Sequence, residues 1–198
     1  MEYDFEIYQL SQKFFTDYPE TKYPELMHKS GRPYSCLLID SHDGYFICVP
    51  YRSSIGHKNS FLFKNTQRSK RTKSGLDYSK IAIVTNTEYF DKDPAIVDKD
   101  EYNETVKHIP TIAQEVVTYV DTYINHINGN APIHQREFDR KYQFSTLKYF
   151  HDILLLNAND ISTEASLSAF NNMRNKTAMS GFMSDEEIEA EINAVRNK

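Results

Sequence analysis

The sequence of 198 residues contains no tryptophan and only two cysteines. Two cysteines are too few for a disulfide framework, and no second pair or spaced set of histidines completes a zinc motif. We expect Cys36 and Cys48 to be buried free thiols on neighbouring strands. No apolar run approaches the roughly 18 residues that a membrane span requires, and the acidic N-terminus lacks a signal-peptide pattern. We therefore expect a cytoplasmic protein without a metal, a cofactor or a membrane partner.

Aromatic residues are plentiful, since the chain has 14 tyrosines and 12 phenylalanines. The core is therefore expected to depend on aromatic side chains. A chain of this length suits one domain of roughly 150 residues with an appendage. The composition changes after a linker-like break at residues 157–160. We predict a first domain at residues 1–157 and a helical, acidic C-terminal extension at residues 158–198.

Acidic residues are absent between residues 44 and 76, although the whole chain has a net charge of −5. This stretch, called the basic segment below, carries a charge of +7, so the rest of the chain carries −12. Its cations are Arg52, Lys58, Lys64, Arg68, Lys70, Arg71 and Lys73. An acidic protein with one basic segment is suited to bind a polyanion there, and nucleic acid is the main candidate. The alternative is an ordinary solvated loop.

Apolar runs and alternation predict an α+β protein. Strands are expected at residues 4–10, 34–40, 45–51, 60–64, 76–86 and 95–97, with a short helix in SQKFFTDYP. The turn SHDG joins the second and third strands into an antiparallel hairpin. Two helices are expected next, at residues 100–108 and from Pro110 to Gly129, because proline favours the first turn of a helix. Another helical segment follows Pro132, and Ser145 or Thr146 is a plausible cap for the stretch after it.

Polar and charged side chains follow the strand 45–51 directly, namely Arg52, Ser53, Ser54, His57 and Lys58. Arginine can hold a phosphate with two hydrogen bonds, lysine can neutralise developing charge, and histidine can transfer protons near neutral pH. The hairpin should also bring the residues before its first strand, His28, Lys29 and Arg32, to the same place. A polar loop after a core strand is the simpler interpretation.

This set of residues suits RNA cleavage without a metal, in which the 2′-hydroxyl attacks its own phosphodiester. His57 is the candidate acid or base, Arg52 and Lys58 stabilise charge, and Ser53 or Ser54 holds the phosphate. Adjacent residues of an extended segment point opposite ways, so the pattern does not choose between the two serines. Further substrate contacts are predicted at His28, Lys29, Arg32, Lys64, Arg68, Lys70 and Arg71.

Two other functions fit parts of the pattern. A non-catalytic RNA-binding module would use the same basic surface. A metal-dependent nuclease built on Asp77 and Lys80 would be sensitive to EDTA, although no further carboxylate has a convincing spacing. The scattered His108, His126, His134 and His151 suit solvated or capping roles.

The phrases PYRSSIGHK and GLDYSK, together with GRPYSCLLID and STLKYF, resemble the ToxN/AbiQ-like endoribonuclease toxins of bacterial type III toxin–antitoxin systems, particularly the TenpN/CptN branch. The similarity covers about residues 3–156. It implies a compact, strongly bent antiparallel sheet related to the Kid/MazF barrel and flanked by helices. It also implies metal-independent RNA cleavage that leaves 2′,3′-cyclic phosphate and 5′-hydroxyl ends. Inhibition by a repeated pseudoknot RNA, which assembles with the toxin into a closed ring, is implied as well.

The family pattern supplies roles for individual positions. Ser53 and Lys58 match a Thr-Ser-Pro-Lys turn of the family, in which the lysine comes earlier, and His57 belongs to the branch pattern. The family's upstream tyrosine and lysine fall near His28 and Arg32.

The C-terminal sequence MSDEEIEAEINAVRNK predicts a helix that begins with a capping box of Ser184 and Glu187. It is similar to the acidic tails of small type II protein antitoxins. We expect its carboxylates to compete with RNA for the basic segment, in the same chain or in a second copy. A solvated or dimer-forming helix is the alternative.

Overall fold

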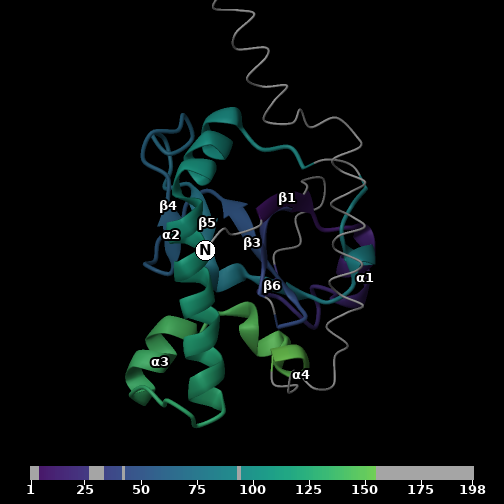
Figure 1. The fold of residues 1–198 in the computed structure, drawn as a ribbon, viewed down its shortest axis with the longest axis vertical. Helices are drawn as coiled ribbons and strands as arrows, with labels where there is room; N and C mark the ends of the chain where they lie inside the picture. The colour runs from purple at the N-terminus through teal and green to yellow at the C-terminus, as the bar shows by residue number, and fades with distance from the viewer. Residues whose placement is uncertain (1–4, 27–33, 42, 93–94, 155–198) are drawn as a thin grey trace, which may run out of the picture. The chain divides into compact units, whose positions relative to one another are not determined.

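The computed structural model describes residues 5–26, 34–41, 43–92 and 95–154 (Figure 1). The chain divides into two units, Met1–Ile161 and Ser162–Lys198, and the second unit lies outside the described residues. The predicted tail helix and the predicted boundary at residue 157 also lie outside them. Within the described residues, no helix has both the length and the apolar character needed to cross a membrane.

Six strands form one antiparallel sheet, which confirms the α+β class. They are β1 (Phe5–Gln9), β2 (Ser35–Asp40), β3 (Phe46–Arg52), β4 (Ser60–Leu62), β5 (Gly75–Asp77) and β6 (Ala82–Val84). The order is β1-β2-β3-β5-β4, and β6 also pairs with β3. The predicted hairpin is present as β2 and β3, with Leu38 opposite Cys48. The path of described strands ends at β1 and β4, which do not pair with each other, so the sheet is open and not closed into the expected barrel.

The predicted strand 76–86 is interrupted, and this interruption builds the candidate site. β5 and β6 share one edge of β3: Leu76 lies opposite Tyr51, and Ala82 lies opposite Cys48. Only two residues of β3 lie between Cys48 and Tyr51, whereas five residues lie between Leu76 and Ala82. The surplus residues leave the sheet as a single 3₁₀ turn, η1 (Tyr78–Lys80). Pro50 of β3 lies beside this excursion and has no N–H to offer to a continuous ladder.

The helices flank the sheet. The short α1 (Gln12–Asp17) packs beside the 3₁₀ turn η2 (Thr87–Tyr89), and the long α2 (Lys99–Ile127) lies along the β4 and β5 side (Figure 1). Beyond the C-terminal part of α2 come α3 (Gln135–Tyr142), the 3₁₀ turn η3 (Thr146–Tyr149) and α4 (His151–Leu154). The expected caps are present: His134 Nδ1 accepts from the Arg136 amide, and Ser145 Oγ accepts from the Leu147 amide.

Two predictions about this region are wrong. The helices expected at 100–108 and from Pro110 form one continuous helix, α2, with Pro110 in its interior. The side chain of Pro110 is exposed, and the buried face of α2 continues on both sides of it through Thr105 and Ile112, so packing outweighs the lost backbone hydrogen bond. The strand expected at 95–97 is absent, because those residues follow an irregular path.

The core contains the central strands and a network of aromatic rings. Cys36 and Cys48 are buried free thiols, as predicted, and burial raises the pKa of the Cys48 thiol. Phe14 is fully buried and stacks on Tyr18, with 4.7 Å between the ring centroids. Full burial of a phenylalanine side chain contributes about 1.5–3 kcal/mol to stability. The core therefore depends on aromatic side chains, as expected.

Candidate active site

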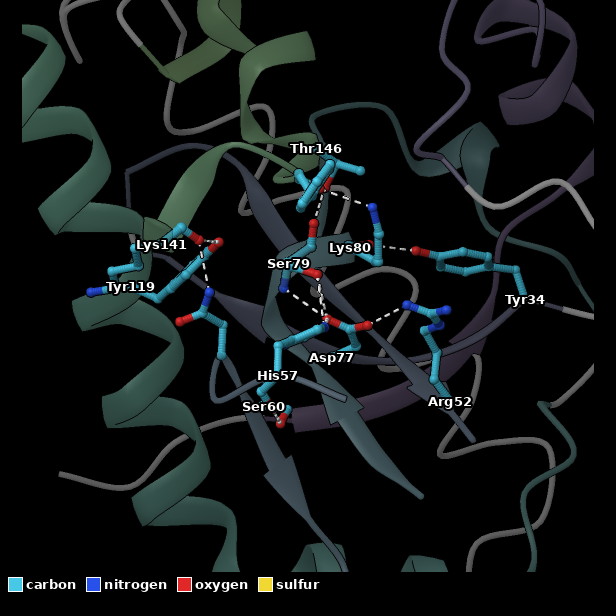
Figure 2. Close-up of polar contacts among 12 residues, drawn as sticks. Tyr34, Arg52, His57, Ser60, Asp77, Ser79, Lys80, Tyr119, Lys141 and Thr146 are labelled. Carbon is cyan, nitrogen blue, oxygen red and sulfur yellow. Dashed lines mark hydrogen bonds and ion pairs between the residues drawn. The ribbon is translucent and has the colours of Figure 1, made fainter. Parts of the chain in front are cut away.

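Asp77, at the end of β5, is completely buried. Its Oδ2 accepts a hydrogen bond from Arg52 Nη1. Its Oδ1 accepts from the Ser79 amide at 2.9 Å and from the Ser79 hydroxyl at 2.7 Å (Figure 2). A buried carboxylate is costly unless such donors surround it. Asp77 is therefore a fixed anion around which other groups are arranged.

Strand register explains why Arg52 reaches this carboxylate. Arg52 lies opposite Gly75 in the β3–β5 pair, so it is the diagonal neighbour of Asp77 on the same face of the sheet. Gly75 has no space for a side chain, because a Cβ atom there would lie 2.0 Å from the carbonyl oxygen of Phe61. The glycine thus permits the close approach of β4 that completes this part of the sheet.

The segment 53–59, called the crossing segment below, passes over β5 and carries His57. Both β3 and β4 run antiparallel to β5, one on each side of it. β3 ends opposite Gly75, whereas β4 begins with Ser60 opposite Asp77. The connection must therefore travel back along β5, outside the sheet. The buried Ile55 anchors it through an amide that donates to Lys73 O at 2.9 Å.

Asp77, Arg52 and Ser79 are called the Asp77 cluster below. His57 contacts this cluster through one ring nitrogen. Its Nε2 lies 3.3 Å from Ser79 Oγ and 3.3 Å from Asp77 Oδ1 (Figure 2). The Ser79 hydroxyl gives its single hydrogen to Asp77, so it must accept from His57, and Nε2 must carry a hydrogen. In the neutral ring Nδ1 is then the unprotonated nitrogen, free to act as a base toward a ligand. The side chain is 39% exposed, so a ligand can reach it.

The turn η1 is fixed by groups from distant parts of the chain. Tyr34 donates to Lys80 O at 2.6 Å, and Thr146 donates to the carbonyls of Ser79 and Ile81. Lys80 Nζ donates to Phe144 O at 2.9 Å. These bonds replace the ladder bonds that the turn gives up by leaving the sheet.

Lys80 is a second cation of the site. Burial lowers the pKa of its ammonium group, and the nearby Arg52 acts in the same direction, while Asp77 opposes them. The side chain of Arg52 is 24% exposed, so this guanidinium also remains accessible to a ligand while it holds Asp77. The side chains of Arg52 and His57 thus contact one buried carboxylate, and the ammonium group of Lys80 interacts with it electrostatically at longer range.

The structure brings only some of the predicted site residues together. Arg52 and His57 both contact Asp77. Ser53, Ser54 and Lys58 are exposed on the crossing segment. None of these three side chains has a hydrogen bond or an ion pair within the described part of the chain. Ser54 has a φ of +60°, so the segment is not extended there and simple alternation does not decide which serine faces a phosphate. The predicted His28, Lys29 and Arg32 lie outside the described residues.

The basic loop, residues 64–73, is bound to the beginning of α2. Backbone amides of Lys64 and Asn65 donate to Glu104, at 2.7 and 3.1 Å. Arg68 Nη2 donates to Asp98 at 2.6 Å, and its Nε lies 3.6 Å from Glu101. The charge of Arg68 is therefore opposed by Asp98, which precedes α2, and by Glu101 in its first turn.

The other predicted contacts of this loop are Lys64, Lys70 and Arg71, whose side chains are exposed and have no ion pair with any described residue. They are available to a ligand. Their neighbour Lys73 is also exposed, and its carbonyl is the anchor of the crossing segment. One end of the basic loop is thus joined to the segment that carries His57.

Sequence reasoning missed the roles of Asp77, Ser79 and Lys80, because it considered Asp77 only as a metal ligand. A signal was available in the Asp-Tyr-Ser pattern, since an Asp that ends a strand two residues before a Ser commonly caps a turn. A single carboxylate that directly follows a long acid-free stretch was a second signal. In the described ranges, no group of three or more His, Cys, Asp and Glu side chains could hold a metal ion.

The resemblance to endoribonuclease toxins rests on short motifs. Two of them, PYRSSIGHK and GLDYSK, contain the residues gathered at Asp77. This chain matches no protein-family model, no curated protein and no solved structure. The geometry of the site is therefore the basis for assigning a function.

Proposed function

We propose that this protein is a metal-independent endoribonuclease that cleaves single-stranded RNA. In the proposed reaction the 2′-hydroxyl attacks the adjacent phosphodiester, and the products are a 2′,3′-cyclic phosphate and a 5′-hydroxyl. One observation carries the proposal: an accessible imidazole is oriented by a buried Asp77–Ser79 pair, while Arg52 binds the same carboxylate. This arrangement sets the tautomer of the base and places a permanent cation near it.

Each group has a defined part in the reaction. His57 Nδ1 takes the proton of the 2′-hydroxyl as its oxygen bonds to phosphorus. The bond from phosphorus to the 5′-oxygen then breaks, and this oxygen leaves with a proton. His28, which lies outside the described residues, is the proposed donor of that proton. Asp77 and Ser79 are positioning residues, because they hold the imidazole through Nε2 and need not touch the substrate.

Cations stabilise the charge that develops on the phosphorane. Arg52 retains further N–H donors beside the one that binds Asp77, and Lys58 is exposed on the same crossing segment. Ser53 is the proposed hydroxyl contact to the phosphate. DNA would bind this surface but resist cleavage because it lacks the 2′-hydroxyl.

The test is incubation of the full chain with a long RNA in EDTA, followed by mapping of the new ends. We expect cyclic phosphate and 5′-hydroxyl ends from the unchanged protein. His57→Ala should lower the cleavage rate by about a hundredfold or more, with RNA binding retained. His134→Ala is the matched control, since His134 caps α3 and contacts no site residue among those described. Intact RNA after prolonged incubation with the unchanged protein would contradict the proposal.

A non-catalytic RNA-binding module is the second candidate. The exposed Lys64, Lys70 and Arg71 on the fixed basic loop favour it, because they offer phosphate contacts without any reacting group. The same experiment separates the two functions. A binder would retain RNA at low salt and leave it intact, and His57→Ala would then change nothing.

The resemblance supplies finer proposals as well. The sheet would have the strong bend of the Kid/MazF type, and a pseudoknot RNA would inhibit the protein within a closed ring. We also propose that the acids of residues 158–198, which include Asp185, Glu186 and Glu187, compete with RNA for the basic segment. Deletion of residues 160–198 should then raise cleavage by the remaining chain, and unchanged activity would end this idea.

A further inference from the structure

Phe144 is unusual among the large apolar side chains of the described residues. It is 64% exposed, and among those residues only Ile96, at 80%, is more so. The backbone around it is well fixed. Ser145 is buried and caps η3, and the buried Thr146 donates to the carbonyls of Ser79 and Ile81. An exposed aromatic ring on a fixed backbone is available for binding at little cost in conformational entropy.

The segment that carries Phe144 borders the candidate active site. At one end, Asn59 Nδ2 donates to Lys141 O at 2.7 Å, and Asn59 is two residues from His57. At the other end, Thr146 bonds to the carbonyl of Ser79, whose hydroxyl contacts His57. Between these ends, Phe144 O accepts from Lys80 Nζ at 2.9 Å. The backbone of Phe144 is therefore bonded to Lys80, whose ammonium group interacts electrostatically with Asp77 and Arg52.

We propose that Phe144 is the stacking platform for a nucleobase next to the phosphate held at the Asp77 cluster. This inference rests on the proposed function and deepens it, since it names the residue that holds an unpaired base beside the reacting phosphate. Aromatic rings beside cations are the usual means of holding single strands, because every base has a flat face and every nucleotide has a phosphate. The cations here are Arg52, Lys80 and, when protonated, His57. They favour a polyanion over the apolar surface of a protein.

Base stacking on Phe144 would determine which form of RNA the protein selects. Stacking tolerates all four bases, so Phe144 by itself selects for an unpaired nucleotide and not for a particular sequence. A base inside a duplex cannot stack on the ring without leaving its pair. Cleavage should therefore be confined to loops and single strands.

The experiment uses the full chain and three variants: Phe144→Ala, Phe144→Leu and Phe144→Tyr. The probe is a single-stranded DNA of about six nucleotides that contains 2-aminopurine, which cannot be cleaved by 2′-hydroxyl attack. We expect the unchanged protein and Phe144→Tyr to quench its fluorescence, because the base stacks on a ring. Phe144→Ala and Phe144→Leu should raise the Kd about tenfold and lose the quenching. On RNA, Phe144→Ala should raise KM by a similar factor with kcat nearly unchanged.

The outcomes separate this inference from the proposed function. If the unchanged protein cleaves RNA and Phe144→Ala alters neither KM nor quenching, the inference fails while the ribonuclease stands. If RNA is never cleaved but Phe144→Ala still weakens probe binding and loses quenching, the inference holds and the chemistry is wrong. If Phe144→Ala leaves probe binding unchanged and instead dissociates copies of the chain in size-exclusion chromatography, the ring is a protein contact and the inference is overturned.

Discussion

The hydroxyl of Ser79 lies 3.3 Å from Nε2 of His57, and this contact determines which nitrogen of the ring can act as a base. The hydroxyl is available only because η1 leaves the sheet immediately after Asp77, which turns Ser79 back toward the carboxylate. Without the interruption between β5 and β6, residue 79 would continue along the edge of β3. The break in the strand therefore supplies the support of the imidazole.

Ser79→Ala tests this relationship. The substitution removes the hydroxyl that accepts from Nε2–H and leaves only Asp77 Oδ1 near this nitrogen, while Asp77 keeps Arg52 and the backbone amide of residue 79. We expect cleavage to fall about tenfold, and the free energy of unfolding to fall by only about 1 kcal/mol. Ser60→Ala is the control, because its hydroxyl bonds to the backbone of His57 and not to the ring. Equal cleavage rates for the two variants, with both folded by circular dichroism, would exclude a positioning role for Ser79.

Gly75→Ala should be strongly destabilising. Its Cβ would meet the backbone of Phe61 at 2.0 Å and Leu62 Cα at 2.9 Å, so β4 would have to move away from β5. A loss of about 3 kcal/mol is expected for overpacking against backbone. Gly56→Ala is the matched control, since nothing lies within 4 Å of its added Cβ. Urea unfolding measures both variants, and a Gly75→Ala midpoint equal to that of Gly56→Ala would show that the two strands pack differently.

We expect two kinds of cation in the basic loop, those free to bind RNA and those already paired with acidic side chains. Lys70→Gln with Arg71→Gln removes two exposed charges, so RNA binding should weaken. The slope of log K against log salt should decrease in magnitude by about 1.4, since each phosphate contact with a single strand contributes about 0.7. Arg68→Gln removes a cation already held by Asp98 and Glu101. It should lower stability by up to about 1 kcal/mol and barely change the slope. A larger loss of slope for Arg68→Gln than for the double variant would reverse this assignment.

Stability should depend on pH through Glu101. Burial raises the pKa of this carboxyl above its ordinary value, against smaller opposing effects of the Ser74 hydroxyl and of Arg68. The folded state then holds the proton more tightly than the unfolded chain does. The corresponding stability is present at low pH and is lost as the pH rises through the folded pKa. Each unit of pKa elevation corresponds to about 1.4 kcal/mol.

Glu101→Gln keeps the shape of the side chain but removes the titration. Its melting temperature should exceed that of the unchanged protein at pH 7, and the difference should disappear well below pH 4.5. Glu104→Gln is the control, because Glu104 accepts the amides of Lys64 and Asn65 and its neutralisation should destabilise the loop. A Glu101→Gln variant that is less stable at pH 7 would mean that the pairing with Arg68 outweighs the burial.

Local patterns predicted the hairpin of β2 and β3 well, because both strands are apolar runs separated by a polar turn. They also placed His57 in the segment that the structure folds over Asp77. They could not predict the break at η1, since residues 76–84 are largely apolar and both halves of the run are buried. The bonds that hold the turn outside the sheet come from Tyr34 and Thr146, which are far away in the sequence.

Pro110 and Asp77 are two further positions at which local sequence patterns could not predict the structure. The preference of proline for the first turn predicted a helix boundary, but the buried face of α2 extends across it, and this tertiary packing decides. The pairing of Asp77 with Arg52 depends on β5 lying between β3 and β4, an order that the local pattern does not contain. The inhibitory RNA, the ring and the tail contact stay predictions.

The bonds around η1 join residues that are far apart in the sequence, and this separation affects the newly made protein. Arg52, Asp77 and Thr146 must all be in place before His57 is supported, so the site cannot be assembled until residue 146 has emerged from the ribosome. Earlier, the nascent chain holds the segments separately and has no oriented imidazole. A ribonuclease built in this way would be harmless to its own messenger RNA for most of its translation.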